Sequence, residues 1–272
     1  MFDIKIIREN PDIVRQSLAN RKDSAPIDEI IELDHNRRVK INELEELRRQ
    51  RKGGKMDPEE GRWLRDQISS LETETSGIDA KLKDLLLRVP NMPHESVPIG
   101  KSEDDNVIVR TIGDETQLDF PARPHWELGE NLGIIDFERG VKISGTRFYV
   151  LNKLGARLQR SLIALFLDIH TKKHGYNEVY LPYIVKRETM QASGNLPKFE
   201  DNLYRDALED KWFVPTAEVP ITSLHADEIL SAADLPIYYV AYTACFRREQ
   251  MSAGKDTRGI KRGHQFDKVE MY

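Results

Sequence analysis

The residues best suited to binding or catalysis lie between Thr243 and Glu270, where two strand-like stretches flank a polar segment. Side chains two apart on a strand share a face, so Arg247 and Glu249 are expected together on the first strand. The second strand is expected to carry five chemically active side chains on one face: Arg262, His264, Phe266, Lys268 and Glu270. Guanidinium groups suit phosphate and carboxylate, an aromatic ring can stack on a nucleobase, and a buried glutamate can bind ammonium. This pattern predicts a pocket for a nucleoside triphosphate beside a small molecule that carries an amino group.

The same charged faces have a simpler interpretation, because the solvated side of an antiparallel sheet is ordinarily polar. Binding is favoured because both stretches carry the pattern and because the segment between them is basic, with Gly254 and Gly259. The sequence contains no Gly-rich phosphate loop, since SAGKDT lacks the first glycine and the hydroxyl residue after its lysine. Arginines on strands must therefore supply the phosphate contacts.

Long helices are predicted ahead of this region. A short helix over residues 3–20 is followed by one over 27–52 and by another that runs to about residue 88. Apolar residues of the last helix recur alternately four and three apart from Leu64 to Val89, which is a heptad pattern. Two such helices joined by a short turn predict an antiparallel coiled-coil arm over about 27–89.

Basic residues gather near the expected tip of this arm, in a chain whose net charge is −5. They are Arg48, Arg49, Arg51, Lys52 and Lys55. A basic stripe on a rigid rod suits the phosphate backbone of RNA, recognised by its shape. The alternative is an arm that serves only as a dimerisation zipper or a spacer.

Prolines end the arm, and the composition changes near residue 107, so we expect domains over 1–100 and 101–272. The second domain is expected to hold strands over 146–151, 177–181 and 212–215, and a helix that follows Thr216-Ala217-Glu218 and runs to about residue 226. An amphipathic helix over 154–174 has a predicted inner stripe of Leu158, Leu162, Leu165, Phe166 and Ile169. Because the sequence stops within an apparent strand, we expect it to be an amino-terminal portion of a longer protein.

The composition excludes several classes of protein. Hydrophobic residues make up 39% and charged residues 32%, which is typical of a chain with long exposed helices. One cysteine allows no internal disulfide, and neither a bilayer-spanning run nor a signal peptide is recognisable, so we expect a cytoplasmic protein. His170 and His174 stand four apart without a further ligand at metal-site spacing, so no metal site is predicted.

Four stretches resemble one enzyme family. FRRE with GKDTRGIKRGHQFDKVEM resembles the second signature motif of class II aminoacyl-tRNA synthetases in its seryl form, and HGYNEVYLPYIV is similar to the first motif. PTAEVP resembles the T-x-E element of the seryl enzymes, and VPNMPHESVPIG with the arm resembles their amino-terminal half. The resemblance implies an α+β fold: a coiled-coil arm, then a class II antiparallel sheet with flanking helices, incomplete at its carboxyl end.

The resemblance also implies residue roles for ATP-dependent formation of seryl-adenylate and its transfer to tRNA(Ser), with tRNA(Sec) as a further candidate acceptor. Arg247 would be catalytic, holding the ATP α-phosphate and the serine carboxylate. Glu249, Arg262 and Phe266 would bind the adenine amino group, the outer phosphates and the adenine ring. Thr216, Glu218 and Glu270 would bind serine, and Arg258 would meet the tRNA acceptor end, while the basic arm residues bind the body of the tRNA.

Two family features are missing from the sequence: the third class II motif and the acidic Mg²⁺ ligands, which the family places downstream. We therefore expect this chain alone to be impaired, and expect a homodimer formed through the helix over 154–174. The alternatives are an amino acid ligase that charges a carrier protein and a non-catalytic tRNA-binding or regulatory paralogue.

Overall fold

The computed structural model describes residues 2–53, 57–250 and 258–272, which form two compact units, Met1–Gly113 and Asp114–Tyr272. Each unit is described separately. The predicted domain boundary at residue 100 lies within the loop that ends the first unit, and it stays a prediction.

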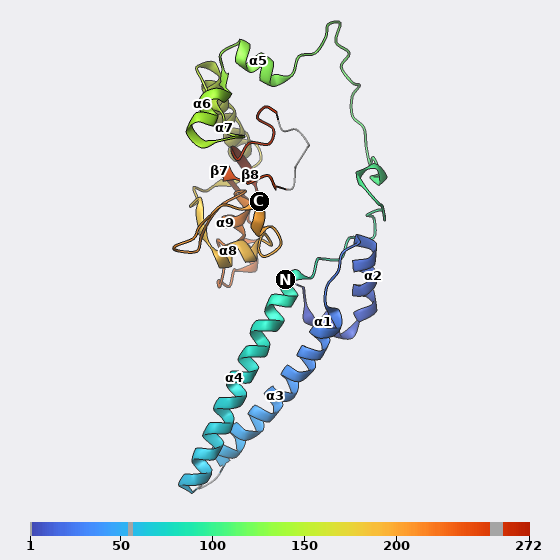
Figure 1. Ribbon diagram of the computed structural model, residues 1–272, viewed down its shortest axis with the longest axis vertical. Coiled ribbons are helices and arrows are strands. Elements are labelled where there is room, and N and C mark those ends of the chain that lie inside the picture. Colours follow the sequence, from blue (N-terminus) through green and yellow to red (C-terminus); the bar gives the residue numbers. More distant parts are fainter. Residues whose placement is uncertain (1, 54–56, 251–257) are drawn as a thin grey trace. The chain divides into compact units, whose positions relative to one another are not determined.

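The described part of the first unit is helical (Figure 1). Its helices are α1 (Ile4–Glu9), α2 (Pro11–Arg21), α3 (Ile27–Gly53) and α4 (Pro58–Arg88), and a 3₁₀ turn, η1 (Glu103–Asp105), follows. The single helix predicted over 3–20 is wrong, because the chain breaks at Asn10, whose φ and ψ are −136° and 55°. A residue before proline is disfavoured in the helical region, and Pro11 suits the first position of a new helix.

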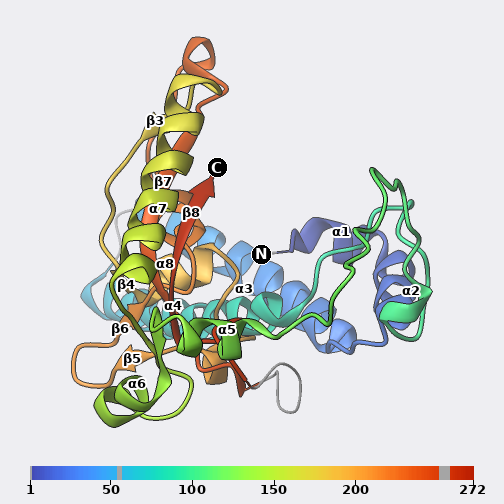
Figure 2. The same cartoon turned by 90° about the horizontal axis from the view of Figure 1, so that it is seen from above.

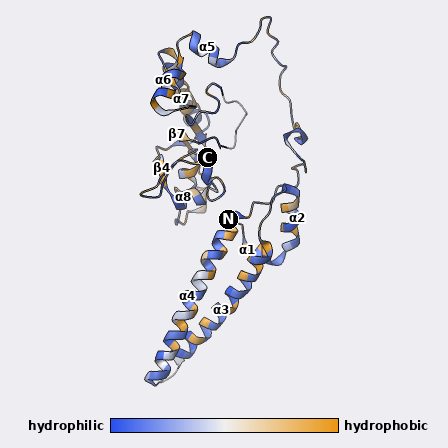
Figure 3. Cartoon of the chain, in the orientation of Figure 1, coloured by the Kyte–Doolittle hydropathy of each residue, from blue (hydrophilic) through white to orange (hydrophobic). Residues whose placement is uncertain are grey.

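Helices α3 and α4 form the predicted antiparallel hairpin (Figure 1). Buried apolar residues face each other along it, including Leu44, Leu64 and Ile68, while both helices also carry many hydrophilic positions (Figure 3). Ion pairs join the two helices along their length: Lys81–Glu29, Arg37–Asp79, Lys40–Glu74 and Arg48–Glu72.

The core of this unit lies at the base of the hairpin. There α1 and α2 pack against the start of α3 and the end of α4 through buried residues such as Ile7, Val14, Ile30 and Leu86. Asp34 is almost fully buried and accepts hydrogen bonds from the Arg8 and Arg38 side chains, so its charge is neutralised beside the core.

The second unit combines short helices with three small sheets. Its helices are α5 (His125–Asn131), α6 (Phe137–Ser144), α7 (Leu154–Lys172), α8 (Arg187–Ala192), α9 (Glu218–Thr222) and the 3₁₀ turns η2 (Glu200–Asn202) and η3 (Ala232–Asp234). Its strands are β1 (Ile135–Asp136), β2 (Val150–Leu151), β3 (Asn177–Glu178), β4 (Ile184–Lys186), β5 (Arg205–Asp206), β6 (Lys211–Phe213), β7 (Tyr239–Phe246) and β8 (Gln265–Met271). The sheets have the orders β1-β2, β3-β7-β8 and β4-β6-β5.

The longest strands, β7 and β8, pair antiparallel, with Cys245 opposite Phe266 and Ala241 opposite Glu270. Strand β3 joins the other edge of β7 in parallel, so this sheet is mixed. Buried side chains of β7 include Val240, Thr243 and Cys245. Helix α7 runs alongside β7 and β8, as Figure 2 shows, and its Gln159 side chain donates a hydrogen bond to Asp267 on β8. The predicted α+β architecture is confirmed.

Several predicted boundaries are wrong. The strand predicted over 146–151 is reduced to β2, because Arg147 has a φ of 64°, which no strand residue adopts. The strand predicted over 177–181 is reduced to β3, and α9 ends at Thr222 rather than near residue 226. The second strand of the motif begins at Gln265 instead of residue 262.

The stripe predicted for the inner face of the amphipathic helix is largely exposed in the single chain. Leu158 is 57% exposed and Leu165 51%, and Leu162 and Phe166 are also exposed. The cause is that α7 contacts the sheet through other positions, such as Gln159. It leaves Leu158, Leu162 and Phe166 beside an open cavity next to β8.

No helix in the part of the chain that the structure describes combines the length and the apolar character required to span a bilayer.

Candidate functional site

A pocket of about 390 Å³ lies where β7 ends, and four of the predicted site residues line it. They are Thr216, Arg247, Glu249 and Arg262. The remaining lining residues are Asn195, Phe199, Asn202, Leu203 and Pro215. The pocket therefore unites three stretches of sequence: the segment from Asn195 to Leu203, the segment before α9, and the two ends of the β7–β8 connection.

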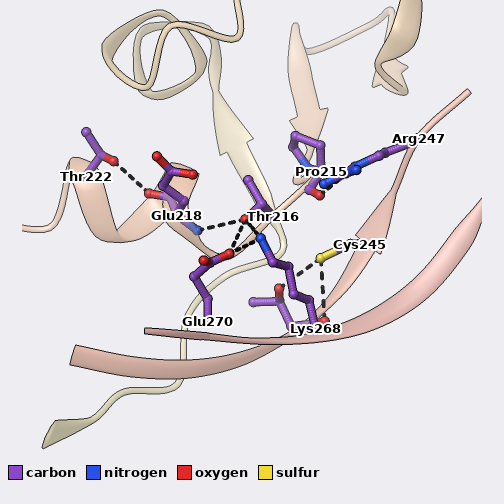
Figure 4. Close-up of polar contacts among 9 residues, drawn as sticks. Pro215, Thr216, Glu218, Thr222, Cys245, Arg247, Lys268 and Glu270 are labelled. Atoms are coloured by element: carbon purple, nitrogen blue, oxygen red, sulfur yellow. Dashed lines mark hydrogen bonds and ion pairs between the residues drawn. The ribbon is translucent and has the colours of Figure 1, made fainter. Parts of the chain in front are cut away.

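Arg247 is the first residue beyond β7, and three contacts fix it. Its main-chain N–H donates to the carbonyl oxygen of His264 at 2.9 Å, which continues the strand pairing. Its Nε donates to the Pro215 carbonyl at 3.2 Å (Figure 4). Its guanidinium carbon lies 5.0 Å from the centre of the Phe266 ring, a cation–π distance. The side chain is thus held across the pocket from β7 towards Pro215.

Glu249 does not continue the alternation of β7, so the predicted shared strand face with Arg247 is wrong. The strand ends at Phe246, and Glu249 has a φ of 51°, which turns the chain out of the sheet. Asn202 stabilises this turn, because its carbonyl accepts from Arg248 N at 2.9 Å and its Oδ1 accepts from Gln250 N at 3.2 Å. Glu249 is only 8% exposed, and an oxygen of its carboxylate lies 3.6 Å from Nη1 of Arg262.

A second group of polar side chains surrounds Thr216, just before α9 (Figure 4). Its Oγ1 donates to Oε2 of Glu270 at 2.7 Å and accepts from Nζ of Lys268 at 3.0 Å. Lys268 also forms an ion pair with Glu270. The main-chain N–H of Glu218 donates to the same Oγ1 at 3.3 Å, while the Glu218 side chain is exposed.

The chemistry of this arrangement is recognition and charge neutralisation. Two guanidinium groups, those of Arg247 and Arg262, are suited to phosphate oxygens, and the Glu270 and Glu218 carboxylates are suited to an ammonium group. Cys245 takes no direct part, since its side chain is fully buried on β7, and burial raises the pKa of its thiol. Among the described residues, no three His, Cys, Asp or Glu side chains gather as a metal site would require.

The other predicted residues lie beside this pocket, in the β7–β8 connection, or in the first unit. Phe266 lines a neighbouring cavity of about 520 Å³ and touches the pocket through Arg247. Arg258, in the connection between β7 and β8, is exposed. In the arm, Arg48 pairs with Glu72 and Arg49 with Glu46, while Arg51 and Lys52 are exposed. Lys55 lies outside the described residues.

Sequence reasoning placed Lys268 on the chemically active strand face without giving it a role, and it missed Asn202. Lys268 carried a usable signal, because it stands two residues from both Phe266 and Glu270 and shares their strand face. Asn202 carried none, because its role depends on contacts to a turn 48 residues away in the sequence.

Known proteins match this chain along its whole length. The family model for the seryl-tRNA synthetase N-terminal domain matches residues 1–56, and that for the tRNA synthetase class II core domain (G, H, P, S and T) matches residues 198–272. A serine–tRNA ligase of Dehalococcoides mccartyi is 62% identical over 277 residues, and one of Chloroflexus aurantiacus is 53% identical over 286 residues. In both cases the match covers all of this chain and 67% of the relative.

Two solved structures are also similar. Seryl-tRNA synthetase from Pyrococcus horikoshii, complexed with ATP, superposes with a TM-score of 0.87 at 37% identity, over 100% of this chain and 69% of that one. Cytoplasmic serine–tRNA ligase from Naegleria fowleri, in complex with AMP, gives a TM-score of 0.83 at 31% identity, over 100% of this chain and 66% of that one.

Proposed function

Because the chain belongs to the seryl-tRNA synthetase family, we propose that it is a serine–tRNA ligase whose second unit activates serine with ATP. In the first step, an oxygen of the serine carboxylate attacks the α-phosphorus of ATP. A new carboxyl–phosphate bond forms, the bond to the β-phosphate oxygen breaks, and pyrophosphate leaves with the bonding electrons. In the second step, a ribose hydroxyl at the end of tRNA(Ser) attacks the seryl carbonyl, and AMP leaves.

The observation that carries this proposal is the meeting of Arg247, Glu249 and Arg262 with Thr216 in one pocket. Arg247 is held by Pro215 and Phe266 at the junction of the two polar groups. From there its guanidinium can bind the serine carboxylate and the α-phosphate together, and stabilise the charge that develops between them. Arg262 neutralises the outer phosphates, Glu249 accepts from the adenine amino group, and Phe266 stacks on the adenine.

Serine would bind among the polar side chains around Thr216. Glu218 and Thr216 bind its ammonium group, and Glu270 binds its polar end. The Lys268 ammonium already lies against Thr216 and Glu270, so it holds the Glu270 carboxylate beside the Thr216 hydroxyl. Little acid–base chemistry is required, since positioning and charge neutralisation dominate transfer at phosphorus.

The family uses Mg²⁺ with ATP, and among the described residues no three His, Cys, Asp or Glu side chains gather into a site that could hold the ion without the substrate. Two of the site's carboxylates already have a cationic neighbour: Glu249 lies beside Arg262, and Glu270 lies beside Lys268. Mg²⁺ is commonly held by substrate phosphates and one or two carboxylates. No step of the mechanism derived from this chain passes through the ion, and its ligands are still expected downstream.

The α3–α4 hairpin would be the coiled-coil arm that binds tRNA(Ser). Arg51 and Lys52 are exposed near the end of α3, where they can reach RNA phosphates, and Lys55 follows them in the sequence. Arg48 and Arg49 are already paired with glutamates, so their share of the binding is smaller. Arg258 would approach the acceptor end of the tRNA.

The exposed apolar stripe of α7 supports a homodimer. Leu158, Leu162, Leu165 and Phe166 together present more apolar surface than an isolated exposed side chain would, and such patches mark interaction sites. A second copy of the chain would cover them. The buried free thiol of Cys245 is in keeping with the cytoplasmic location that the sequence predicts.

The test is amino-acid-dependent exchange of pyrophosphate into ATP, run with each standard amino acid. It should use this chain and a chain continued to the length of its relatives. Exchange with serine alone supports the proposal. No exchange with any amino acid, in a chain shown to be folded, would instead favour the non-catalytic paralogue.

A deletion separates the two units by function. Removing residues 28–88 should leave serine activation intact and abolish charging of tRNA(Ser), because the arm takes no part in forming the adenylate. Unchanged charging of tRNA(Ser) would contradict the role proposed for the arm.

A further inference from the structure

Hydrogen bonds hold both described ends of the connection between β7 and β8. The residues that make them, Arg147 and His125, lie outside the four stretches that resemble the synthetase family. One end carries Glu249, and the other carries Ile260 and Arg262 on the way to His264. Each end contacts the segment between α5 and β2, more than a hundred residues earlier in the chain.

Arg147 fastens both ends. Its Nη1 donates to the main-chain carbonyl of Glu249 at 3.1 Å, and its own carbonyl accepts from the N–H of His264 at 3.1 Å. Arg147 has a φ of 64°, in the left-handed region that side chains rarely adopt. The two hydrogen bonds, one from the Arg147 side chain and one to its carbonyl, hold Arg147 in this conformation.

His125 fastens the returning end. Its Nε2 accepts a hydrogen bond from the Ile260 N–H at 3.0 Å, two residues before Arg262. Gly259 permits this contact, because its φ is 81° and any Cβ at this position would clash with the His125 ring. Close by, a Cβ on Gly263 would lie 2.8 Å from the Tyr149 ring, so the same segment packs against the connection twice.

We propose that Arg147 and His125 are positioning residues for the ATP half of the site. Neither lines the pocket, and both act through the main chain of the residues beside it. Arg147 fixes the turn that directs the Glu249 side chain, and His125 fixes the approach to Arg262. The proposal rests on the proposed function, and it predicts an effect on ATP with little effect on serine, whose residues are held separately by Thr216, Lys268 and Glu270.

The main test measures pyrophosphate exchange as a function of ATP and of serine concentration. Arg147→Ala should raise KM for ATP about 3- to 10-fold, the range expected when one positioning hydrogen bond is lost, and leave KM for serine unchanged. Arg147→Lys retains a donor and should recover part of the loss. His125→Ala should behave in the same direction, and His125→Gln, which keeps an acceptor, should recover part of it.

Gly259→Ala probes the same contact without removing either side chain. The added methyl group displaces the His125 ring, so KM for ATP should rise, and His125→Ala should add little to it in the double variant. If Arg147→Ala fails to fold, KM for ATP in the His125 and Gly259 variants still tests the proposal, because these residues act at the end of the connection that leads to β8.

Two exposed residues supply matched controls: Arg123→Ala for Arg147→Ala, and His94→Ala for His125→Ala. Both should keep wild-type kinetics. Equal rises in KM for ATP and serine, or unchanged kinetics in the folded Arg147 and His125 variants, would overturn the inference. All variants are made in the chain continued to the length of its relatives, and the absence of any exchange by that wild-type protein would instead overturn the proposed function, so the two failures are distinguishable.

Discussion

Thr216 donates a hydrogen bond of 2.7 Å to Glu270, although 54 residues separate them in the sequence. A threonine hydroxyl has one donor and two acceptor positions. Here Oγ1 donates to Glu270 and accepts from Lys268 and from the Glu218 main chain, so all three are used. The hydroxyl therefore fixes the loop before α9 against β8. A substrate ammonium group that enters must compete with the Lys268 ammonium for the same oxygens.

Replacing Thr216 by valine keeps the shape of the side chain and removes this junction. Because the lost contacts involve charged partners worth about 1.5–3 kcal/mol, KM for serine should rise about 10- to 100-fold while KM for ATP changes little. Serine-dependent pyrophosphate exchange measures both. Thr222→Val is the control, since its hydroxyl donates to the main-chain carbonyl of Glu218 and not to a side chain proposed to touch serine. A wild-type KM for serine in Thr216→Val would exclude this hydroxyl from serine binding.

Arg247→Ala should lower the rate of serine activation by about two to three orders of magnitude, the usual cost of removing a donor that stabilises developing charge. The fold should survive, because the lost contacts are one hydrogen bond to Pro215 and one cation–π contact to Phe266. Arg247→Lys should not restore activity, since an ammonium cannot bind two oxygens as a guanidinium fork does. Arg248→Ala, next in sequence but directed at Tyr204, is the control. Comparable activity in the Arg247 and Arg248 variants would remove Arg247 from the mechanism.

The sequence predicts the elements of this protein well where one periodicity runs for many residues. The heptad pattern predicts the paired helices, and the apolar, β-branched stretch before Phe246 predicts β7. The prediction fails where one residue changes the local backbone. Pro11 divides the first predicted helix into two. The positive φ of Arg147 prevents a strand from beginning at residue 146, and the positive φ of Glu249 turns the chain out of the sheet.

The site divides in the same way. The pairing of Arg247, Glu249 and Arg262 could be predicted from strand alternation and family resemblance, although alternation gave the wrong reason for Glu249. The contributions of Asn202, Arg147 and His125 could not be predicted, because each acts through a main-chain group distant in sequence. Long-range contacts of this kind leave no periodic pattern.

The base of the hairpin should be sensitive to truncation of its core. Ile30 is fully buried among α1, α2 and α4, so Ile30→Ala should cost about 2–5 kcal/mol in the free energy of unfolding of the first unit. Val39, on the same helix, is 42% exposed, and Val39→Ala should stay within about 0.5 kcal/mol. Urea unfolding of the two variants, followed by far-ultraviolet circular dichroism, compares them. Equal midpoints would show that α1 and α2 do not pack on the hairpin in solution.

His264 makes the stability of the second unit depend on pH. Burial first, and then the nearby charges of Arg147 and Arg248, lower the pKa of this imidazole, while Glu249 opposes them. In the unfolded chain it titrates near its ordinary pKa of about 6.5. Above that pH both states are neutral and nothing is lost. As the pH falls below it, the unfolded state binds a proton that the folded state excludes, so stability declines until the pH reaches the lowered pKa.

The corresponding test is to measure the melting temperature of the wild-type protein and of His264→Asn between about pH 8 and pH 5, around the ordinary histidine pKa. The decline on acidification should be smaller in the variant, although losing the 2.8 Å contact between Tyr204 and Nδ1 of His264 lowers its melting temperature at every pH. His35→Asn, which alters an exposed histidine in the first unit, should retain the wild-type slope. Parallel curves for the wild type and His264→Asn would mean that protonation of this imidazole does not oppose folding.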